Sequence, residues 1–323
     1  MAGAINNFMI NNSMINNSMI DEQAVRCTAC PRLCGAVRRP GTVPGSGGGF
    51  CRSGSLPVLA RAAAHFGEEP CISGTRGSGA VFFSGCSLRC VFCQNEPISR
   101  RHFGQEVTVE RLREIFLELA AGGVHNINLV NPTHFAAAIA EALEQPLPVP
   151  VVYNSSGYES VETLRRLEGK IQIYMPDCKY ALSQPAAHYS GAADYPQTAR
   201  AAIVEMYRQR GRYRMDDEGI LQSGVLIRHL VLPGSRENTR QVIDWLTSTF
   251  APGEVLFSLM GQYTPCGDLS GFPELQHPLS MPEYSEAEDY LLATGWEDGY
   301  LQPPEAAGVE HIPAFDLTGV CPK

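Results

Sequence analysis

The stretch Ala80-Val-Phe-Phe-Ser-Gly85, followed at once by Cys86-Ser-Leu-Arg-Cys90-Val-Phe-Cys93, decides how this chain is interpreted. Its apolar first part predicts a buried strand, and the cysteines follow where that strand ends. Three thiolates this close together can hold three irons of a cubic [4Fe–4S] cluster and leave the fourth iron open. The alternatives are a structural zinc site, or thiols that pack as small buried hydrophobes. We expect the open cluster, because the loop offers zinc no fourth ligand.

Apolar runs typical of buried strands alternate with helical patterns along the rest of the chain. The strands are predicted at 80–85, 126–130, 149–154, 171–176, 225–232 and 254–259. The helices are predicted at 109–119, 135–144, 160–167, 196–210 and 238–250. This alternation indicates parallel strands joined by right-handed crossovers. Periodicity by itself leaves a closed barrel, an incomplete barrel and an open sheet as alternatives.

Polar side chains follow the carboxyl ends of five predicted strands, where ligands bind in parallel sheets. The candidates, in chain order, are Asn131, Thr133, Asn154, Ser156, Asp177, Lys179, Arg228 and Gln262. Any of them could instead cap a helix or serve a turn. In a regular strand Arg228 and His229 face opposite sides, and we choose Arg228 for the ligand side because its planar fork matches a carboxylate.

Composition and net charge indicate which partners and which compartment to expect. The chain has 323 residues, 44% of them hydrophobic, and a net charge of −9, which gives nucleic acid no electrostatic support. No apolar run approaches the roughly 20 residues that span a bilayer, so no membrane partner is expected. Seven of the eleven cysteines fall in two ligand-like clusters, which favours a reducing cytoplasm over a disulfide-bonded protein.

A second cysteine cluster lies upstream, at Cys27, Cys30, Cys34 and Cys51. Four thiolates suit either a tetrahedral zinc or a second [4Fe–4S] cluster. Either metal would stabilise a segment too small to form its own core. We therefore expect three parts: a low-complexity, disordered tail at 1–24, a cysteine-rich extension at 25–79, and an α/β domain with a C-terminal extension at 80–323.

From Cys27 to about Gly319 the sequence resembles radical S-adenosylmethionine (SAM) proteins of the pyruvate formate-lyase activating enzyme-like family. It is more distantly similar to glycyl-radical activating enzymes. The resemblance is carried by Gly74-Thr-Arg-Gly-Ser-Gly79, the cysteine loop through Gln94-Asn95, His125-Asn-Ile-Asn-Leu129, Asn154-Ser-Ser-Gly-Tyr158, Arg228-His-Leu-Val-Leu-Pro-Gly234 and Gln262-Tyr-Thr-Pro265. It implies an incomplete (β/α)6 TIM-like barrel of the radical SAM type.

The resemblance also implies roles for individual residues. In this superfamily the amino and carboxylate groups of SAM chelate the open iron, and an aromatic residue, here Phe92, precedes the last cysteine. Asp177 and Lys179 match residues that bond the SAM ribose or carboxylate. Asn154 and Ser156 are similar to the ribose-side residues of the third strand.

Three further places complete the expected SAM pocket. The segment Asn131-Pro-Thr133-His134 stands where a Gly-Gly-Glu loop usually contacts the SAM amino group, and it departs from that pattern. Arg228 could neutralise a carboxylate through two parallel hydrogen bonds. Gln262 follows the sixth strand and completes the expected SAM pocket. No residue is assigned as catalytic.

The expected function is that of an oxidoreductase-type radical SAM enzyme, which cleaves SAM to a 5′-deoxyadenosyl radical that abstracts a substrate hydrogen. The expected partners are an electron donor such as flavodoxin or ferredoxin and, by resemblance to activating enzymes, a protein whose glycine is the substrate. A small molecule or peptide is the alternative substrate. A non-catalytic interaction module that binds zinc or iron–sulfur clusters is the alternative from another class.

Overall fold

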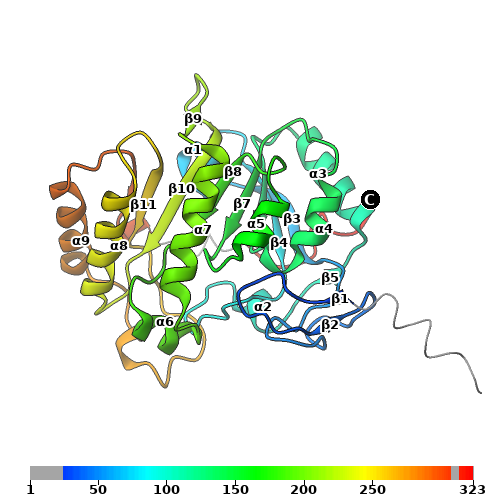
Figure 1. Cartoon of the computed structure of the whole chain (residues 1–323), viewed down its shortest axis with the longest axis horizontal. Coiled ribbons are helices and arrows are strands. Elements are labelled where there is room, and N and C mark those ends of the chain that lie inside the picture. Colours follow the sequence, from blue (N-terminus) through cyan, green and yellow to red (C-terminus); the bar gives the residue numbers. More distant parts are fainter. Residues whose placement is uncertain (1–24, 307–312, 323) are drawn as a thin grey trace, which may run out of the picture.

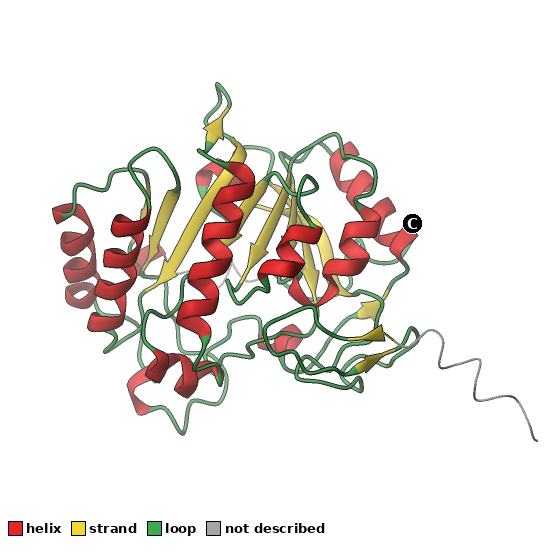
Figure 2. Cartoon of the chain, viewed as in Figure 1, coloured by secondary structure: helices red, strands yellow, loops and turns green. Residues whose placement is uncertain are grey.

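The structure is a computed structural model that describes residues 25–306 and 313–322; the predicted tail at 1–24 lies outside these ranges. Its centre is one mixed sheet in the order β12-β11-β10-β8-β7-β6-β4-β3-β5, with β9 paired to β10 (Figures 1 and 2). The strands are β3 Val58–His65, β4 Ser78–Phe83, β5 Gln105–Glu106, β6 Ile127–Val130, β7 Val151–Ser155, β8 Ile173–Pro176, β9 Arg214–Met215, β10 Leu221–Leu230, β11 Leu256–Met260 and β12 Gly299–Gln302.

The six predicted strands correspond to β4, β6, β7, β8, β10 and β11, and each pairs in parallel with its neighbour. The predicted α/β class with a parallel sheet is confirmed. The sequence analysis did not predict β12, which adds a parallel strand beside β11. At the other edge β3 pairs antiparallel with β4. In the described ranges the two edges do not pair with each other, so the sheet is open and no barrel closes.

Helices cover one face of this sheet (Figure 2). They are α3 Val109–Ala121, α4 Ala136–Ala142, α5 Val161–Arg166, α7 Tyr195–Arg210, α8 Arg236–Thr249 and α9 Met281–Ala293. The five predicted helices correspond to α3, α4, α5, α7 and α8. In α3 the Thr108 side chain accepts a hydrogen bond from the Arg111 backbone N–H and caps the helix. Leu112, Ile115 and Phe116 then bury one face of α3.

The opposite face of the sheet is concave and is closed near its amino end by α1, Pro70–Ser73. Cys71 and Ile72 of this short helix pack against a buried cluster that includes Val152 and Leu226. The remaining short helices are α2 Glu96–Ser99, α6 Ser183–Ser190, η2 Thr133–Phe135, η3 Pro273–Leu275 and η4 Pro304–Ala306. In Figure 1, α1 lies at one end of the strands and α2 and α6 lie at the other.

The segments at both ends of the described chain pack against this domain. β1 Val25–Arg26 and β2 Val37–Arg38 form a separate two-stranded sheet in the cysteine-rich extension. Near the C-terminus the backbone N–H of Leu317 donates to the carbonyl of Ala60 at 3.0 Å, so this segment returns to β3. Within the described ranges, every helix is too short or too polar to cross a lipid bilayer.

Candidate functional site

The three cysteines of the loop after β4 line a cavity of about 290 Å³ on the concave face. Gly85 starts this loop with a φ of +89°, and a Cβ added there would lie 2.6 Å from Ser53 Oγ. Only glycine therefore lets the chain turn from the strand into the loop at this point. The strand end and the turn together hold Cys86, Cys90 and Cys93 at the rim of the cavity.

Each of these thiols receives a hydrogen bond. The Cys86 sulfur accepts from the backbone N–H groups of Leu88 and Arg89 at 3.3 and 3.4 Å. Ser190 Oγ donates to Cys90 at 2.9 Å, and Ser99 Oγ donates to Cys93 at 3.3 Å. Hydrogen bonds to ligand sulfurs stabilise the thiolate form and tune the potential of a bound cluster.

Burial raises the pKa of the Cys86 and Cys93 thiols, which makes them costly to ionise without a metal. It raises the pKa of Cys86 to about 12, and the neighbouring Cys90 and Cys93 add to the shift. In the described ranges, His, Cys, Asp and Glu side chains nowhere gather in threes as tightly as one metal ion requires. A cubic cluster spreads its thiolates over separate irons, so its ligands lie farther apart than those of a single ion. A cluster on this loop is therefore supported by the spacing of its three cysteines.

A network of charged and amide side chains fills the concave face beside this loop. Arg228 on β10 donates from Nε to Asp177 at 3.2 Å, from Nη1 to Glu68 at 3.0 Å and from Nη2 to Asn154 at 2.6 Å. Lys179 Nζ donates to the other oxygen of Asp177 at 2.5 Å. All three nitrogens of the Arg228 guanidinium thus already have partners.

The network stabilises the charged forms of its members. Burial alone would raise the pKa of Asp177, but the positive charges of Lys179 and Arg228 outweigh it and lower that pKa. Burial alone would lower the pKa of Arg228, but Asp177, Glu69 and Glu68 raise it. Both groups therefore remain ionised inside the concave face.

The pleat of β10 decides which side chain of the Arg228-His229 pair reaches the cavity. Arg228 lines it, whereas His229 is buried on the helix side. There its Nδ1 lies 2.7 Å from the Cys178 carbonyl oxygen and its Nε2 lies 2.9 Å from Thr239 Oγ1 on α8. Burial lowers the pKa of His229 to about 4. The expected orientation of this pair is the one observed.

The structure brings most of the sequence-predicted SAM residues to this one cavity. Its walls include Phe92, Asn131, Asn154, Ser156, Asp177, Lys179, Arg228 and Gln262. Thr133 does not reach the cavity: its hydroxyl donates to the buried Glu159 at 2.5 Å, and Tyr153 donates to the same carboxyl at 3.1 Å. The placement of Thr133 gives it a structural partner, whereas the SAM contacts of the others stay predictions.

Two acidic residues of the cavity were missed by the sequence analysis. Glu68 and Glu69 come from the turn between β3 and α1 and line the concave face. Glu68 accepts hydrogen bonds from Asn128 at 2.9 Å and Asn154 at 3.1 Å, besides its contact with Arg228. The sequence does show two adjacent carboxylates before Pro70, but no local pattern indicates which strands they contact.

Of the upstream cysteines, Cys51 lies beside the start of the cluster loop: a Cβ added at Gly85 would lie 3.0 Å from the Cys51 carbonyl oxygen. Arg38 is buried, and its Nη2 lies 2.9 Å from the Cys51 sulfur. Burial also raises the pKa of Cys30 to about 12. Cys27, Cys30, Cys34 and Cys51 are free thiols in the structure. Their metal, zinc or a second cluster, stays a prediction.

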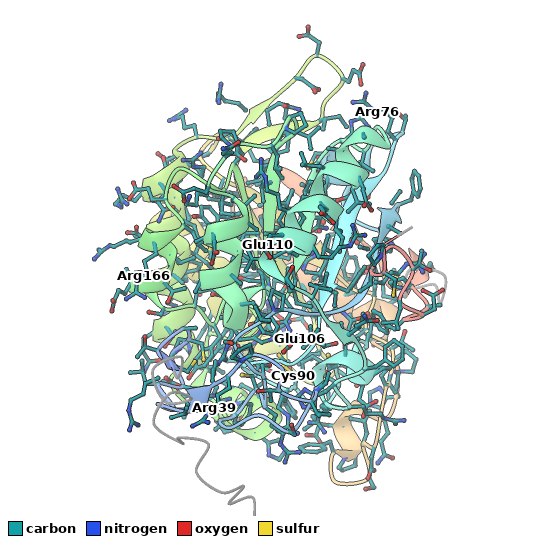
Figure 3. All side chains as sticks on the ribbon, turned by 90° about the vertical axis from the view of Figure 1, so that its right-hand side faces the viewer. Arg39, Arg76, Cys90, Glu106, Glu110 and Arg166 are labelled. Carbon is teal, nitrogen blue, oxygen red and sulfur yellow. The ribbon has the colours of Figure 1, made fainter. Side chains whose placement is uncertain are left out.

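Arg32 joins this upstream segment to the cluster loop. Its Nε donates to the Ser87 carbonyl at 2.8 Å and its Nη2 donates to the Ser190 carbonyl at 3.0 Å. Ser190 is also the residue whose hydroxyl bonds Cys90. In Figure 3 the labelled Cys90 lies at the same end of the molecule as Arg39 of the extension, with Arg76 at the opposite end.

Comparisons with known proteins support the cluster. Residues 73–167 match the family described as "4Fe-4S single cluster domain", and this range contains the whole cysteine loop. An uncharacterized protein of Methanocaldococcus jannaschii is 26% identical over 249 residues, which cover 74% of this chain and 68% of the relative. The family match supports the predicted [4Fe–4S] cofactor on the loop after β4.

Solved structures overlap the fold only weakly. Streptococcus suis SuiB bound to its precursor peptide SuiA gives a TM-score of 0.46 at 12% identity, over 67% of this chain and 46% of SuiB. SuiB bound to S-adenosylmethionine gives a TM-score of 0.41 at 13% identity, over 70% of this chain and 46% of SuiB. Escherichia coli QueE gives a TM-score of 0.40 at 9% identity, over 77% of this chain and 94% of QueE. The chain thus spans less than half of SuiB, and these likenesses carry no argument about its activity.

Proposed function

We propose that this protein is a radical SAM enzyme. The observation that carries the proposal is the meeting of two groups in one cavity: the rim holds Cys86, Cys90 and Cys93, and the wall beside it holds Asp177 and Lys179. The cysteine loop supplies a site for an iron cluster with one open iron. The charged wall supplies donors and acceptors for the polar groups of a bound nucleoside and amino acid.

One electron from an external donor such as flavodoxin or ferredoxin, passed through a [4Fe–4S] cluster to SAM, yields methionine and a 5′-deoxyadenosyl radical that takes a substrate hydrogen. The chain's own residues hold and orient the reactants. Lys179 is the cation we assign to the SAM carboxylate, because every nitrogen of Arg228 is already engaged, whereas Lys179 Nζ bonds Asp177 and has two further N–H groups to donate. Asn154 and Ser156 offer polar groups to the ribose from β7 and the turn after it, and Ser156 Oγ has no hydrogen-bond partner among the described residues.

The identity of the substrate is a more specific proposal than the class of reaction. Activation of a glycyl-radical enzyme rests on the sequence resemblance. It predicts an EPR doublet of a glycyl radical on a partner protein after incubation with SAM and reductant. The cavity of about 290 Å³ lies at the small end of ligand pockets. SAM takes part of the same cavity in this proposal, so the substrate enters it as a small molecule or as a single side chain or backbone segment of a peptide.

The proposal is tested by anaerobic reconstitution of the full chain with iron and sulfide. We expect about four irons per cluster site, visible absorption, and release of 5′-deoxyadenosine from SAM after reduction with dithionite. A protein that carries the full cluster and binds no SAM would contradict the proposal. Zinc in both cysteine clusters and a colourless protein would favour the alternative, an interaction module without catalysis.

A further inference from the structure

The floor of the cavity is built from residues at the opposite end of the strands from the cysteine loop. Glu68 and Glu69 follow β3, whose last residue, His65, pairs with Ser78 at the start of β4. The cysteine loop follows the other end of β4, after Phe83. Figure 1 shows the same separation, with α1 beyond one end of the strands and α2 beyond the other. A ligand that fills the cavity therefore meets the cysteines at one end and these carboxyl groups at the other.

The charges that line the cavity do not balance. Its lining Asp and Glu residues are Glu68, Glu69 and Asp177, and its lining Lys and Arg residues are Lys179 and Arg228. Asp177 contacts both cations, and Glu68 contacts Arg228. The two cations are thus matched by Asp177 and Glu68. Glu69 has no ion pair with a cation in the described ranges, although its field still acts on Arg228.

Glu69 is also incompletely hydrogen-bonded. Its side chain is buried, with 3% of the residue exposed. Gln302 Nε2 donates to Oε1 of Glu69 at 3.2 Å, and Ser258 also lies within hydrogen-bonding reach of this carboxyl group. Oε2 of Glu69 has no hydrogen-bond partner among the described residues. Buried acceptors without donors are costly, and they mark a place for a ligand that brings donors.

We propose that the floor of the cavity binds a primary ammonium group of the substrate, with Glu69 as its carboxylate partner. An ammonium offers three donors and one positive charge, which satisfies the free oxygen of Glu69 and balances the cavity. The inference deepens the proposed function and rests on it. In that function the amino group of SAM is taken up by the open iron at the rim, so the ammonium at the floor belongs to the substrate.

The state of Glu69 without ligand agrees with this role. Burial raises the pKa of Glu69 and the charge of Arg228 lowers it, so the charged carboxylate is costly while the floor is empty. A cation that binds beside Glu69 offsets the free-energy cost of burying the Glu69 charge, in the way that Arg228 does for Glu68. The substrate class is therefore an amine such as an amino acid side chain or a small polyamine, and not an acid.

The test uses the full chain with its cluster reconstituted, with and without SAM, and three probes of equal length: n-butylammonium, n-butanol and n-butyrate. Ligand-observed NMR measures their dissociation constants. We expect n-butylammonium to bind at least about tenfold more tightly than the other two. Glu69→Gln is expected to remove this preference, whereas the same change at the exposed Glu162 (Glu162→Gln) keeps it.

The outcomes separate this proposal from the proposed function. Equal binding of the three probes to the wild type would overturn the ammonium site. If Glu69→Gln lowered SAM affinity as much as n-butylammonium affinity, Glu69 would face SAM itself and the assignment to the substrate would be wrong. If the protein bound no SAM, the radical SAM proposal would fail, while the probe preference would still be measured on the SAM-free protein.

Discussion

Nη1 of Arg228 lies 3.0 Å from Oε2 of Glu68, and this ion pair joins β10 to the turn before α1 across 160 residues of the chain. Both side chains are largely buried, with 15% and 9% exposed. Because the two charges are removed from water together, loss of Glu68 leaves the buried Arg228 with Asp177 as its remaining ion-pair partner in the described ranges. The pair therefore fixes the orientation of the Arg228 guanidinium and closes one side of the cavity.

Replacing Glu68 by alanine is expected to lower the free energy of unfolding by about 3 kcal/mol, because Arg228 keeps its buried charge and loses a partner. Urea denaturation of the cluster-free chain measures this. The exposed pair Arg166–Glu162 provides the control, since its side chains are 63% and 75% exposed. Glu162→Ala should cost less than about 1 kcal/mol. Equal losses of free energy of unfolding in the two variants would show that the buried Glu68–Arg228 pair stabilises the fold no more than the exposed pair does.

Replacing Cys93 by alanine is expected to remove the cluster, because two thiolates do not hold a cubic cluster as three do. Iron analysis should fall by about four atoms per chain, and the visible absorption and the release of 5′-deoxyadenosine should disappear. Cys321→Ala is the matched control, since this exposed cysteine lies outside both clusters. Full iron content in Cys93→Ala would contradict the assignment of this ligand.

Replacing Lys179 by alanine is expected to weaken SAM binding about tenfold, which corresponds to about 1.4 kcal/mol. The reason is that Lys179 bonds Asp177 at the cavity wall and is the cation proposed for the SAM carboxylate. Iron content should stay unchanged, because Lys179 is not a cluster ligand. Calorimetric titration with SAM measures the affinity, with Lys170→Ala as control. Iron loss in step with SAM loss would mean that Lys179 supports the fold of the loop.

Acid should destabilise the protein partly through His229. Burial holds the pKa of His229 at about 4, below its ordinary value of 6.5. A depressed pKa means that the unfolded chain binds the proton more readily. The contribution of the neutral His229 to the free energy of unfolding is therefore fully present above pH 6.5 and is lost as pH falls from 6.5 towards 4. The shift amounts to about 3 kcal/mol.

Denaturation curves at several pH values test this dependence on His229. The wild type should lose stability across that window, and His229→Gln should lose less of it, while His277→Gln at an exposed site should behave as the wild type. The same slope in all three proteins would show that other groups cause the acid sensitivity.

Replacing Arg32 by alanine is expected to loosen the cluster loop, because Arg32 bonds the carbonyl oxygens of Ser87 and Ser190. Loss of the cluster in air should become several-fold faster, and the reduction potential measured by EPR-monitored titration should shift. Arg26→Ala, in the same extension, is the control. An unchanged potential and an unchanged rate of loss would show that the extension does not act on the loop.

Much of the site follows from local pattern. Apolar runs alternating with helical patterns predict parallel strands, and the carboxyl ends of such strands meet at one edge of the sheet. That rule was enough to bring Asn154, Asp177 and Arg228 together, and the alternation of side chains within a strand was enough to separate Arg228 from His229. The cysteine spacing predicted the cluster loop without reference to the rest of the chain.

Other features depend on contacts between distant segments. Thr133 stands beside Asn131 in the sequence, but the short η2 helix places its hydroxyl on Glu159 and away from the cavity. β12 is only four residues long and gains its place by pairing with β11. β3 joins the main sheet by antiparallel pairing with β4. None of these outcomes is encoded in the periodicity of the segment itself.

The sequence by itself determined the strand order along the chain, the three-cysteine loop and the polar strand ends, because each depends on residues that are neighbours in the chain. Only the tertiary structure decided that Glu68 and Glu69 lie under the cavity and that Arg228 is fully engaged. A carboxylate placed before a proline carries no local sign of its partner. Its role depends on which strands surround it, and the packing of α1 against the concave face sets that.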